Sequence, residues 1–148
     1  MENNVHIRIK TYQEVDGEVD EPIELETFGK YGMLNGNHYL IYEESEMTGF
    51  EDTTTTIKAG KGFVTVTRKG KYNMQMRYVV GERNLCLYQT LYGETAVQIN
   101  TQKIDRNLDE NGGRLRVEYT LDEDNMCFVK NALHVQVQKL ENNKEKRL

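Results

Sequence analysis

The sequence predicts one all-β domain over residues 1–148, folded as a closed or nearly closed antiparallel up-and-down β-barrel of about 8–10 strands. Three observations support this prediction. Apolar and polar residues alternate with a period of two along most of the chain, turn residues recur at short intervals, and no window carries the apolar stripe of an amphipathic helix. Consecutive hairpins without a long crossover favour a meander that closes on itself.

Four segments show the alternation most clearly, each with apolar side chains at every second position. In chain order, the rows expected to face inward are Val5, Ile7 and Ile9; Ile23, Leu25 and Thr27; Leu115, Val117, Tyr119 and Leu121; and Leu133, Val135 and Val137. Glycine-containing turns separate the strands, as at Asn35-Gly36 and Asn111-Gly112-Gly113. The charged segment 139–148 is expected to be a frayed end.

Two central hairpins, within residues 53–80, allow a register to be derived. A two-residue turn at Gly60-Lys61 and a three-residue turn over 69–71 keep apolar side chains on a single face. This buried face comprises Ile57, Val64, Val66, Met74, Met76 and Tyr78, and it ends with Thr53, Arg68 and Tyr72 side by side.

Arg68 is therefore expected to point inward at one mouth of the barrel. A charge in that position needs water or a carboxylate, since a buried unpaired charge is costly. Glu43 and Glu44 are the nearest acidic residues by strand order. We expect Arg68 to donate a charge-assisted hydrogen bond to one of them, or to a tyrosine or a backbone carbonyl at the same end.

The strand over residues 84–92, "NLCLYQTLY", could bury either face. One face carries Leu85, Leu87, Gln89 and Leu91, and the other carries Cys86, Tyr88, Thr90 and Tyr92. Both faces are apolar enough for a core, so its orientation stays open. If one of them is exposed, contact with another copy of the chain becomes an expected use for it.

Composition excludes several classes of partner. The chain has 19 Lys and Arg against 24 Asp and Glu, a net charge of −5, which argues against nucleic acid and against an anionic membrane as partners. The N-terminus lacks the pattern of a signal peptide, and no apolar stretch approaches the roughly 20 residues of a membrane span. Cys86 and Cys127 are therefore expected to be reduced thiols in a cytoplasmic protein, and a disulfide between them is the less favoured alternative.

No motif predicts a metal site or a cofactor. Asp105-x-Asn107-x-Asp109 begins like a calcium loop, but Glu110 and Arg116 stand where that loop needs Gly and Glu. The three histidines are scattered, form no metal-ligand pair, and are expected at the surface. No glycine-rich loop opens a helix, so no phosphate cradle is visible.

Several strand motifs, in a fixed order, resemble a known family. They are "YLIYEE" (39–44), "TTTIK" (54–58), "VTVTRKG" (64–70), "MQMRYVVG" (74–81), "YQTLYG" (88–93) and "LRVEYTL" (115–121). The chain is similar over nearly its whole length to the YwiB-like family of small bacterial proteins, a domain of unknown function placed with the calycins. The resemblance implies a lipocalin-like barrel in a bacterial cytoplasm, and it implies no activity.

A mixed polar and aromatic set is the candidate site. Its members are Tyr42, Glu44, Arg68, Tyr72, Tyr78 and Tyr119. An arginine, a carboxylate and several phenols could hold the anionic head group of a ligand inside an apolar pocket. The sequence thus favours a non-catalytic binding module for a small, partly apolar ligand. The alternatives are an enzyme that uses this cluster, and a structural or interaction protein in which the cluster only closes the barrel.

Overall fold

The computed structural model describes residues 3–90, 93–123 and 127–140, and in these ranges it has one sheet of 11 strands and a short 3-10 helix. The elements are β1 (Val5–Val15), β2 (Glu18–Val19), β3 (Ile23–Leu34), β4 (Asn37–Glu43), η1 (Glu46–Thr48), β5 (Thr53–Ala59), β6 (Phe63–Gly70), β7 (Met74–Val79), β8 (Arg83–Thr90), β9 (Gly93–Asp109), β10 (Gly112–Glu123) and β11 (Cys127–Lys139). No helix in the described ranges is long and apolar enough to cross a membrane.

The strands follow one another around a ring. Each named strand from β3 to β11 pairs antiparallel with the next in sequence, and β1 pairs with both β3 and β11. Only the two-residue β2 lies outside the ring. The prediction of a nearly closed antiparallel barrel is therefore confirmed, and the ring of ten strands lies within the expected range of about 8–10. Its assignment to the calycins remains an expectation from the resemblance.

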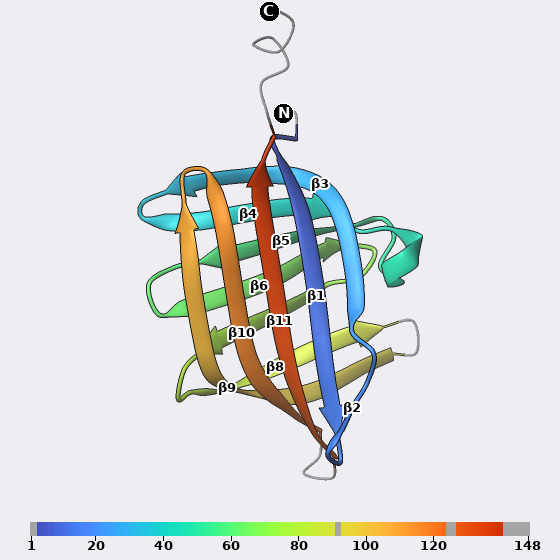
Figure 1. Ribbon diagram of the computed structural model, residues 1–148. Helices are drawn as coiled ribbons and strands as arrows, with labels where there is room; N and C mark the ends of the chain where they lie inside the picture. The colour runs from blue at the N-terminus through green and yellow to red at the C-terminus, as the bar shows by residue number, and fades with distance from the viewer. Residues whose placement is uncertain (1–2, 91–92, 124–126, 141–148) are drawn as a thin grey trace, which may run out of the picture.

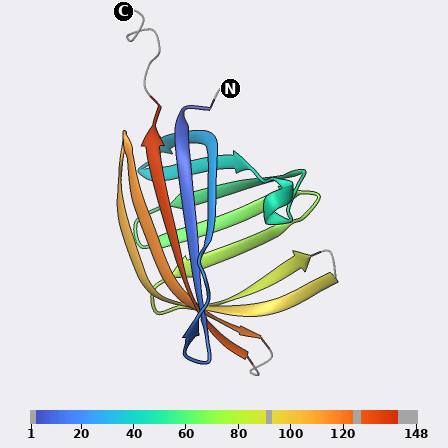
Figure 2. The same cartoon turned by 45° about the vertical axis from the view of Figure 1, so that its right-hand side comes forward.

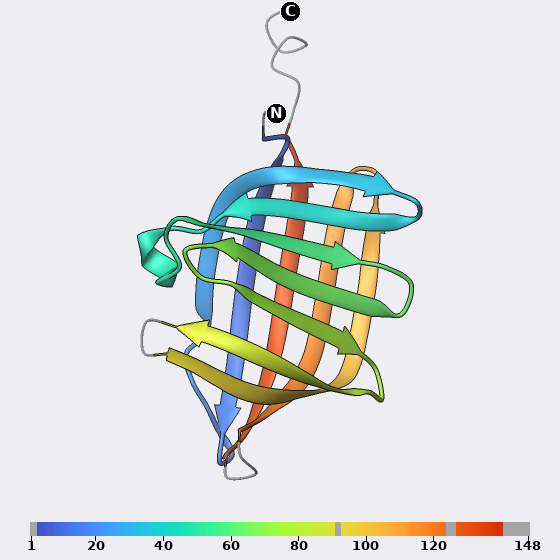
Figure 3. The same ribbon diagram turned by 180° about the vertical axis from the view of Figure 1, so that it is seen from behind.

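Two layers cross at a steep angle. The front layer in Figure 1 consists of the second half of β9 together with β10, β11 and β1. Strands β4 to β8 form the back layer, which runs across the front layer and faces the viewer in Figure 3. β3 and β9 belong to both layers because each changes its pairing along its length. β3 pairs with β1 up to Gly29 and with β4 from Lys30, and β9 pairs with β8 over its first half and β10 over its second.

The weakest join in the ring lies between β7 and β8. Met74 opposite Tyr88 is the single residue pair described between the two strands, whereas β6 and β7 pair from Phe63 opposite Val79 to Arg68 opposite Met74. In Figure 2 the β8–β9 hairpin diverges from β7 toward the right. The barrel is therefore nearly closed, with a seam at one side.

The predicted inward rows form most of the core. Buried residues include Val5, Ile7, Ile9, Ile57, Val64, Val66, Met74, Met76, Tyr78, Leu115, Val117, Tyr119, Val135 and Val137. Ile23 is an exception, since 73% of it is exposed. The first half of β3 has β1 as its neighbour on one side, but β4 pairs only with the second half. The start of β3 is thus an edge, and the expectation that Ile23 faces the core was wrong.

The register expected for the central hairpins was off by two residues. Ala59 lies opposite Val64 and not Gly62, because the turn is Lys61-Gly62, with Gly62 at φ +83°. Arg68 likewise lies opposite Met74 and not Tyr72, because the next loop is longer than three residues. An even shift leaves every side chain on its own face, so the predicted buried face survived both errors.

We expect Gly29→Ala to lower the free energy of unfolding by about 2 kcal/mol. A Cβ there would lie 2.5 Å from the Ile41 carbonyl oxygen and 2.6 Å from Ile7 Cδ1, where β3 passes from one layer to the other. Gly32→Ala is the matched control, because no atom lies within 4 Å of its Cβ position. Urea unfolding of the two variants measures the difference, and equal midpoints would contradict the packing argument.

Candidate functional site

A buried ion pair lies at one mouth of the barrel, where β4 ends. The backbone N–H of Glu44 donates to the Thr53 carbonyl, which keeps Glu44 on the inner face that it shares with Tyr42. Arg68 Nε lies 3.4 Å from Glu44 Oε2. The side chain of Glu44 is 1% exposed and that of Arg68 is 18% exposed. The carboxylate is therefore sealed, and the arginine lies between it and the solvent.

Thr55 completes the environment of this carboxylate. It lies on β5 directly between Tyr42 on β4 and Arg68 on β6, and its hydroxyl donates to Glu44 Oε2. Burial, together with the negative charge of Glu44, raises the pKa of Tyr42. Tyr42 therefore stays a neutral phenol beside the ion pair.

Phe50, in the loop that follows η1, covers the outer side of Arg68. The guanidinium carbon lies 4.2 Å from the centre of the Phe50 ring, a cation–π contact. The Phe50 ring meets Tyr72 edge-on at 5.6 Å. Arg68 Nη1 also donates to Met74 Sδ at 3.5 Å. The loop after β4 therefore holds the arginine against the mouth.

Tyr78 and Tyr119 form a second, deeper group. Their rings meet edge-on at 4.7 Å, and the Tyr78 hydroxyl donates to Met76 Sδ at 3.3 Å. Burial raises the pKa of Tyr78 well above its ordinary value, and the nearby Tyr119 raises it further. The six candidate residues are thus divided between a mouth group, with Tyr42, Glu44, Arg68 and Tyr72, and this interior pair.

The contact expected for Arg68 is confirmed, while its expected neighbours were wrong. Arg68 pairs with Glu44, and Glu43 is exposed on the other face of the strand. Arg68 lies opposite Thr55 and Met74, not beside Thr53 and Tyr72. The role of these residues in holding a ligand stays a prediction.

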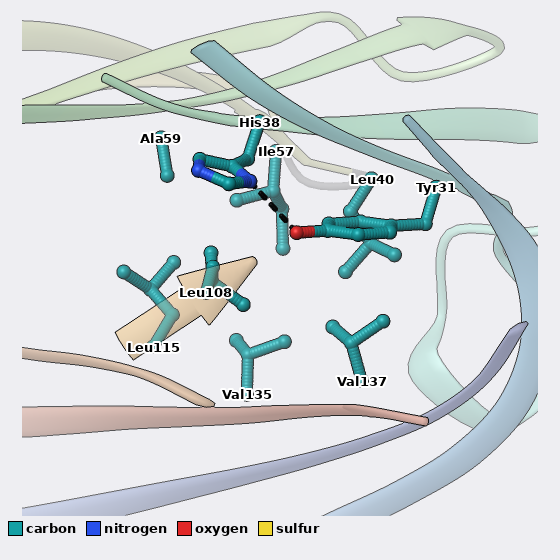
Figure 4. Close-up of a pocket in the computed structure, with 9 residues that line it drawn as sticks. All are labelled: Tyr31, His38, Leu40, Ile57, Ala59, Leu108, Leu115, Val135 and Val137. Atoms are coloured by element: carbon teal, nitrogen blue, oxygen red, sulfur yellow. Dashed lines mark hydrogen bonds between the residues drawn. The ribbon is translucent and has the colours of Figure 1, made fainter. Parts of the chain in front are cut away.

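The other end of the barrel has a polar contact that the sequence analysis did not predict. His38 is buried, and its Nδ1 lies 2.7 Å from the Tyr31 hydroxyl (Figure 4). The same hydroxyl donates to the backbone carbonyl of Asp109 at 2.7 Å. Because a hydroxyl has one hydrogen, His38 Nδ1 carries a proton and donates to the Tyr31 oxygen when Asp109 is the acceptor.

Almost no space remains beneath this contact. The cavity that Figure 4 shows has a volume of about 10 Å³, which is room for about one water molecule. It is lined by Tyr31, His38, Leu40, Ile57, Ala59, Leu108, Leu115, Val135 and Val137. Burial raises the pKa of Tyr31 to about 12 and lowers that of His38. Both side chains are therefore neutral near neutral pH.

His38 corrects the expectation that the histidines lie at the surface. It stands two residues before Leu40 and four before Tyr42, and all three point inward from β4. The same alternation along β4 that turns Leu40, Tyr42 and Glu44 inward also turns His38 inward, so this pattern could have identified it. Among the described residues, no group of three or more His, Cys, Asp or Glu side chains could hold a metal ion.

The orientation of β8 is settled where its side chains are described. Cys86 faces the core as a free thiol, and burial raises its pKa. Leu85 and Leu87 point outward and are 67% and 55% exposed. The side chains of residues 88–92 and Cys127 lie outside the part that the structure describes.

We expect Arg68→Met to lower the free energy of unfolding by about 1–3 kcal/mol, because Glu44 would remain buried without a cation. The double variant Glu44→Gln/Arg68→Met should recover part of this loss, since it buries no charge. Arg77→Met, on the exposed outer face of β7, is the control and should change stability by less than about 1 kcal/mol, because it loses only an exposed cation–π contact with Phe63. Urea unfolding measures all three, and no recovery in the double variant would contradict the explanation.

His38 should make the protein less stable in mild acid. Its folded-state pKa is below the ordinary 6.5, so the unfolded chain takes up this proton at a higher pH than the folded chain does. The free energy of unfolding should therefore fall as the pH drops below about 6.5, and level off below the folded-state pKa. His38→Gln should flatten this dependence in urea unfolding measured across the pH range.

Burial also lowers the pKa of His134, so His134→Gln has to be measured in parallel. The pH dependence of the free energy of unfolding that remains in His38→Gln then gives the contribution of His134. If His38→Gln leaves this pH dependence unchanged, His38 does not contribute to the loss of stability in mild acid.

Comparison with known proteins agrees with this architecture. The family model described as "Domain of unknown function (DUF1934)" matches residues 7–135. The chain is 32% identical over 120 residues to the uncharacterized beta-barrel protein YwiB of Bacillus subtilis (strain 168), covering 81% of this chain and 82% of that protein. The crystal structure of the Bacillus subtilis ywiB protein superposes with a TM-score of 0.70 at 27% identity, covering 90% of this chain and 91% of that one. The protein thus belongs to the DUF1934 family, whose function is unknown.

Proposed function

We propose that the protein is a non-catalytic binding module, which holds a small, partly apolar ligand with an anionic group at the mouth beside Arg68. The observation that carries this proposal is the unequal burial of the ion pair. The Glu44 side chain is 1% exposed, while Arg68 in front of it is 18% exposed and can be reached from the solvent. An inward arginine at an open mouth is well suited to orient a carboxylate or phosphate.

The guanidinium keeps donors for such a group. It has five N–H donors, and the contacts described for it use Nε toward Glu44 and Nη1 toward Met74 Sδ. The Phe50 ring against the guanidinium fixes its plane without using a donor. A planar donor group held in this way loses little entropy when it binds an anion.

The apolar part of the ligand would lie along β6 and β7. Val66, Met74 and Met76 form the inward row next to Arg68, and methionines adapt readily to an inserted group. The seam between β7 and β8 runs along this row, so the wall can open there at low cost. The cavity of about 10 Å³ at the far end is too small for a ligand, which favours the mouth.

The alternatives draw on the same residues. A purely structural cluster would explain the Glu44, Thr55 and Arg68 contacts without any ligand. An enzyme that uses Glu44 as acid or base is less well supported, because a carboxylate that is 1% exposed has no path to a substrate.

Self-association is a second candidate function. It is favoured by the outer face of β8, where Leu85 and Leu87 are exposed next to the exposed Ala96 of β9. A second copy of the chain would cover this apolar strip.

Native mass spectrometry of protein purified from its own host tests the binding function. We expect a fraction with added mass, which is lost in Arg68→Met and kept in Arg77→Met. Loss of the added mass in Arg68→Met, measured under conditions in which urea unfolding shows that this variant is still folded, would support the binding proposal. Uniformly ligand-free protein would favour the structural alternative. The same spectra count the chains per particle, and a pure monomer would count against self-association.

A further inference from the structure

A basic groove crosses the outer face of the front layer, on the side of the sheet away from the barrel interior. Its volume is about 270 Å³, and it is lined by Arg8, Lys10, Arg114, Leu115, Arg116, His134, Val135 and Gln136. These residues come from β1, β10 and β11, which lie side by side in Figure 1. Four cations thus share one groove on a chain whose net charge is −5.

The strand register places these cations in two rows with β11 in the middle. In one row Gln136 lies opposite Arg8 on one side and Arg114 on the other. In the next row His134 lies opposite Lys10 and Arg116. Neighbouring strands are about 4.8 Å apart and alternate residues about 7 Å apart, so four long cationic side chains can converge over the neutral residues between them.

Two of the four cations form no ion pair in the described part of the chain. Arg8 contacts Glu26 at 2.9 Å, and Arg116 lies 3.8 Å from Glu118. Lys10 and Arg114 have no ion pair described. Like charges gathered in this way repel one another, and a bound anion would relieve the repulsion.

His134 provides an independent sign of a missing partner. Its Nε2 is buried and has no hydrogen-bond partner within the described residues, although His134 lines the groove. Its ring packs against Tyr12 with centroids 4.8 Å apart, which limits its freedom to turn toward water. A buried polar atom without a partner is unfavourable, so this nitrogen is well placed to meet a ligand.

We propose that this groove binds a small molecule with two or more linked phosphoryl groups. Two rows of cations about 7 Å apart suit a chain of oxyanions better than a single one. The volume of about 270 Å³ admits a small ligand but not a large one.

A nucleic acid does not fit the same surface, because carboxylates border it on both sides. Glu26 and Glu24 of β3 lie opposite Arg8 and Lys10, and Asp105 of β9 lies opposite Arg116. The positive potential therefore ends within one strand on either side, where a long phosphate backbone would be repelled.

Isothermal titration with inorganic pyrophosphate, at low salt and without divalent cations, tests the proposal. We expect saturable binding that is weaker for orthophosphate and weakest for sulfate. Arg114→Gln should raise the Kd about tenfold. Arg77→Gln is the matched control on the outer face of β7, in the other layer, and should leave the Kd unchanged. In NMR spectra the ring signals of His134 should shift on binding, and those of the buried His38 should not.

Gln136→Glu separates binding from folding. A carboxylate between Arg8 and Arg114 would pair with these arginines and lower the positive charge of the groove, so pyrophosphate binding should be lost while the thermal midpoint stays the same or rises. Pyrophosphate binding that survives in Gln136→Glu would overturn the proposal. So would equal affinity for sulfate, no heat up to roughly 10 mM pyrophosphate, or tighter binding of a DNA duplex than of pyrophosphate.

Discussion

Closure of the ring between β1 and β11 is the constraint on which the rest of the structure depends. These strands come from opposite ends of the chain and pair from Val5 opposite Lys139 to Val15 opposite Val129. With that join made, the inner faces of both layers are shielded from water, and apolar burial can stabilise the fold. Without it, β1 and β11 would be two open edges, and the rows of Ile7 and Val135 would lose their cover. The join also brings Arg8 and Lys10 of β1 next to β11, so the outer groove exists only because the barrel is closed.

Both ends of the barrel contain buried polar groups, which form an ion pair at one end and a hydrogen bond between neutral side chains at the other. At the mouth, Glu44 and Arg68 form an ion pair in which the carboxylate is buried and the arginine is 18% exposed. At the far end, Tyr31 and His38 are neutral, because burial shifts the pKa of each away from its charged form. A neutral hydrogen-bonded contact closes an end at lower desolvation cost than an ion pair does. This contrast is the reason why the proposed ligand site is placed at the mouth and not at the far end.

Much of the fold and part of the candidate site could be predicted from the sequence. Alternation and the short turns predicted the inward rows, the ring of antiparallel strands and the inward position of Arg68, and they left Glu43 and Glu44 as alternative partners for it. Ile23 was misjudged because alternation reports which face a residue shares, not whether another strand covers that face. The outer groove was missed because its cations belong to strands far apart in sequence, and each of them looks like an ordinary solvated residue by itself.

The sequence by itself determined the face of each strand on which a residue lies, because side chains alternate along an extended backbone whatever the neighbouring strands do. The tertiary structure decided which residues meet across the strands. The register of β5, β6 and β7 moved by two residues from the expected one, since loop geometry and packing, and not alternation, choose among registers that differ by an even number. The tertiary structure also decided that Leu85 and Leu87 face outward while Cys86 faces inward. Both faces of β8 are apolar, so only the fit of this strand against the core could select between them.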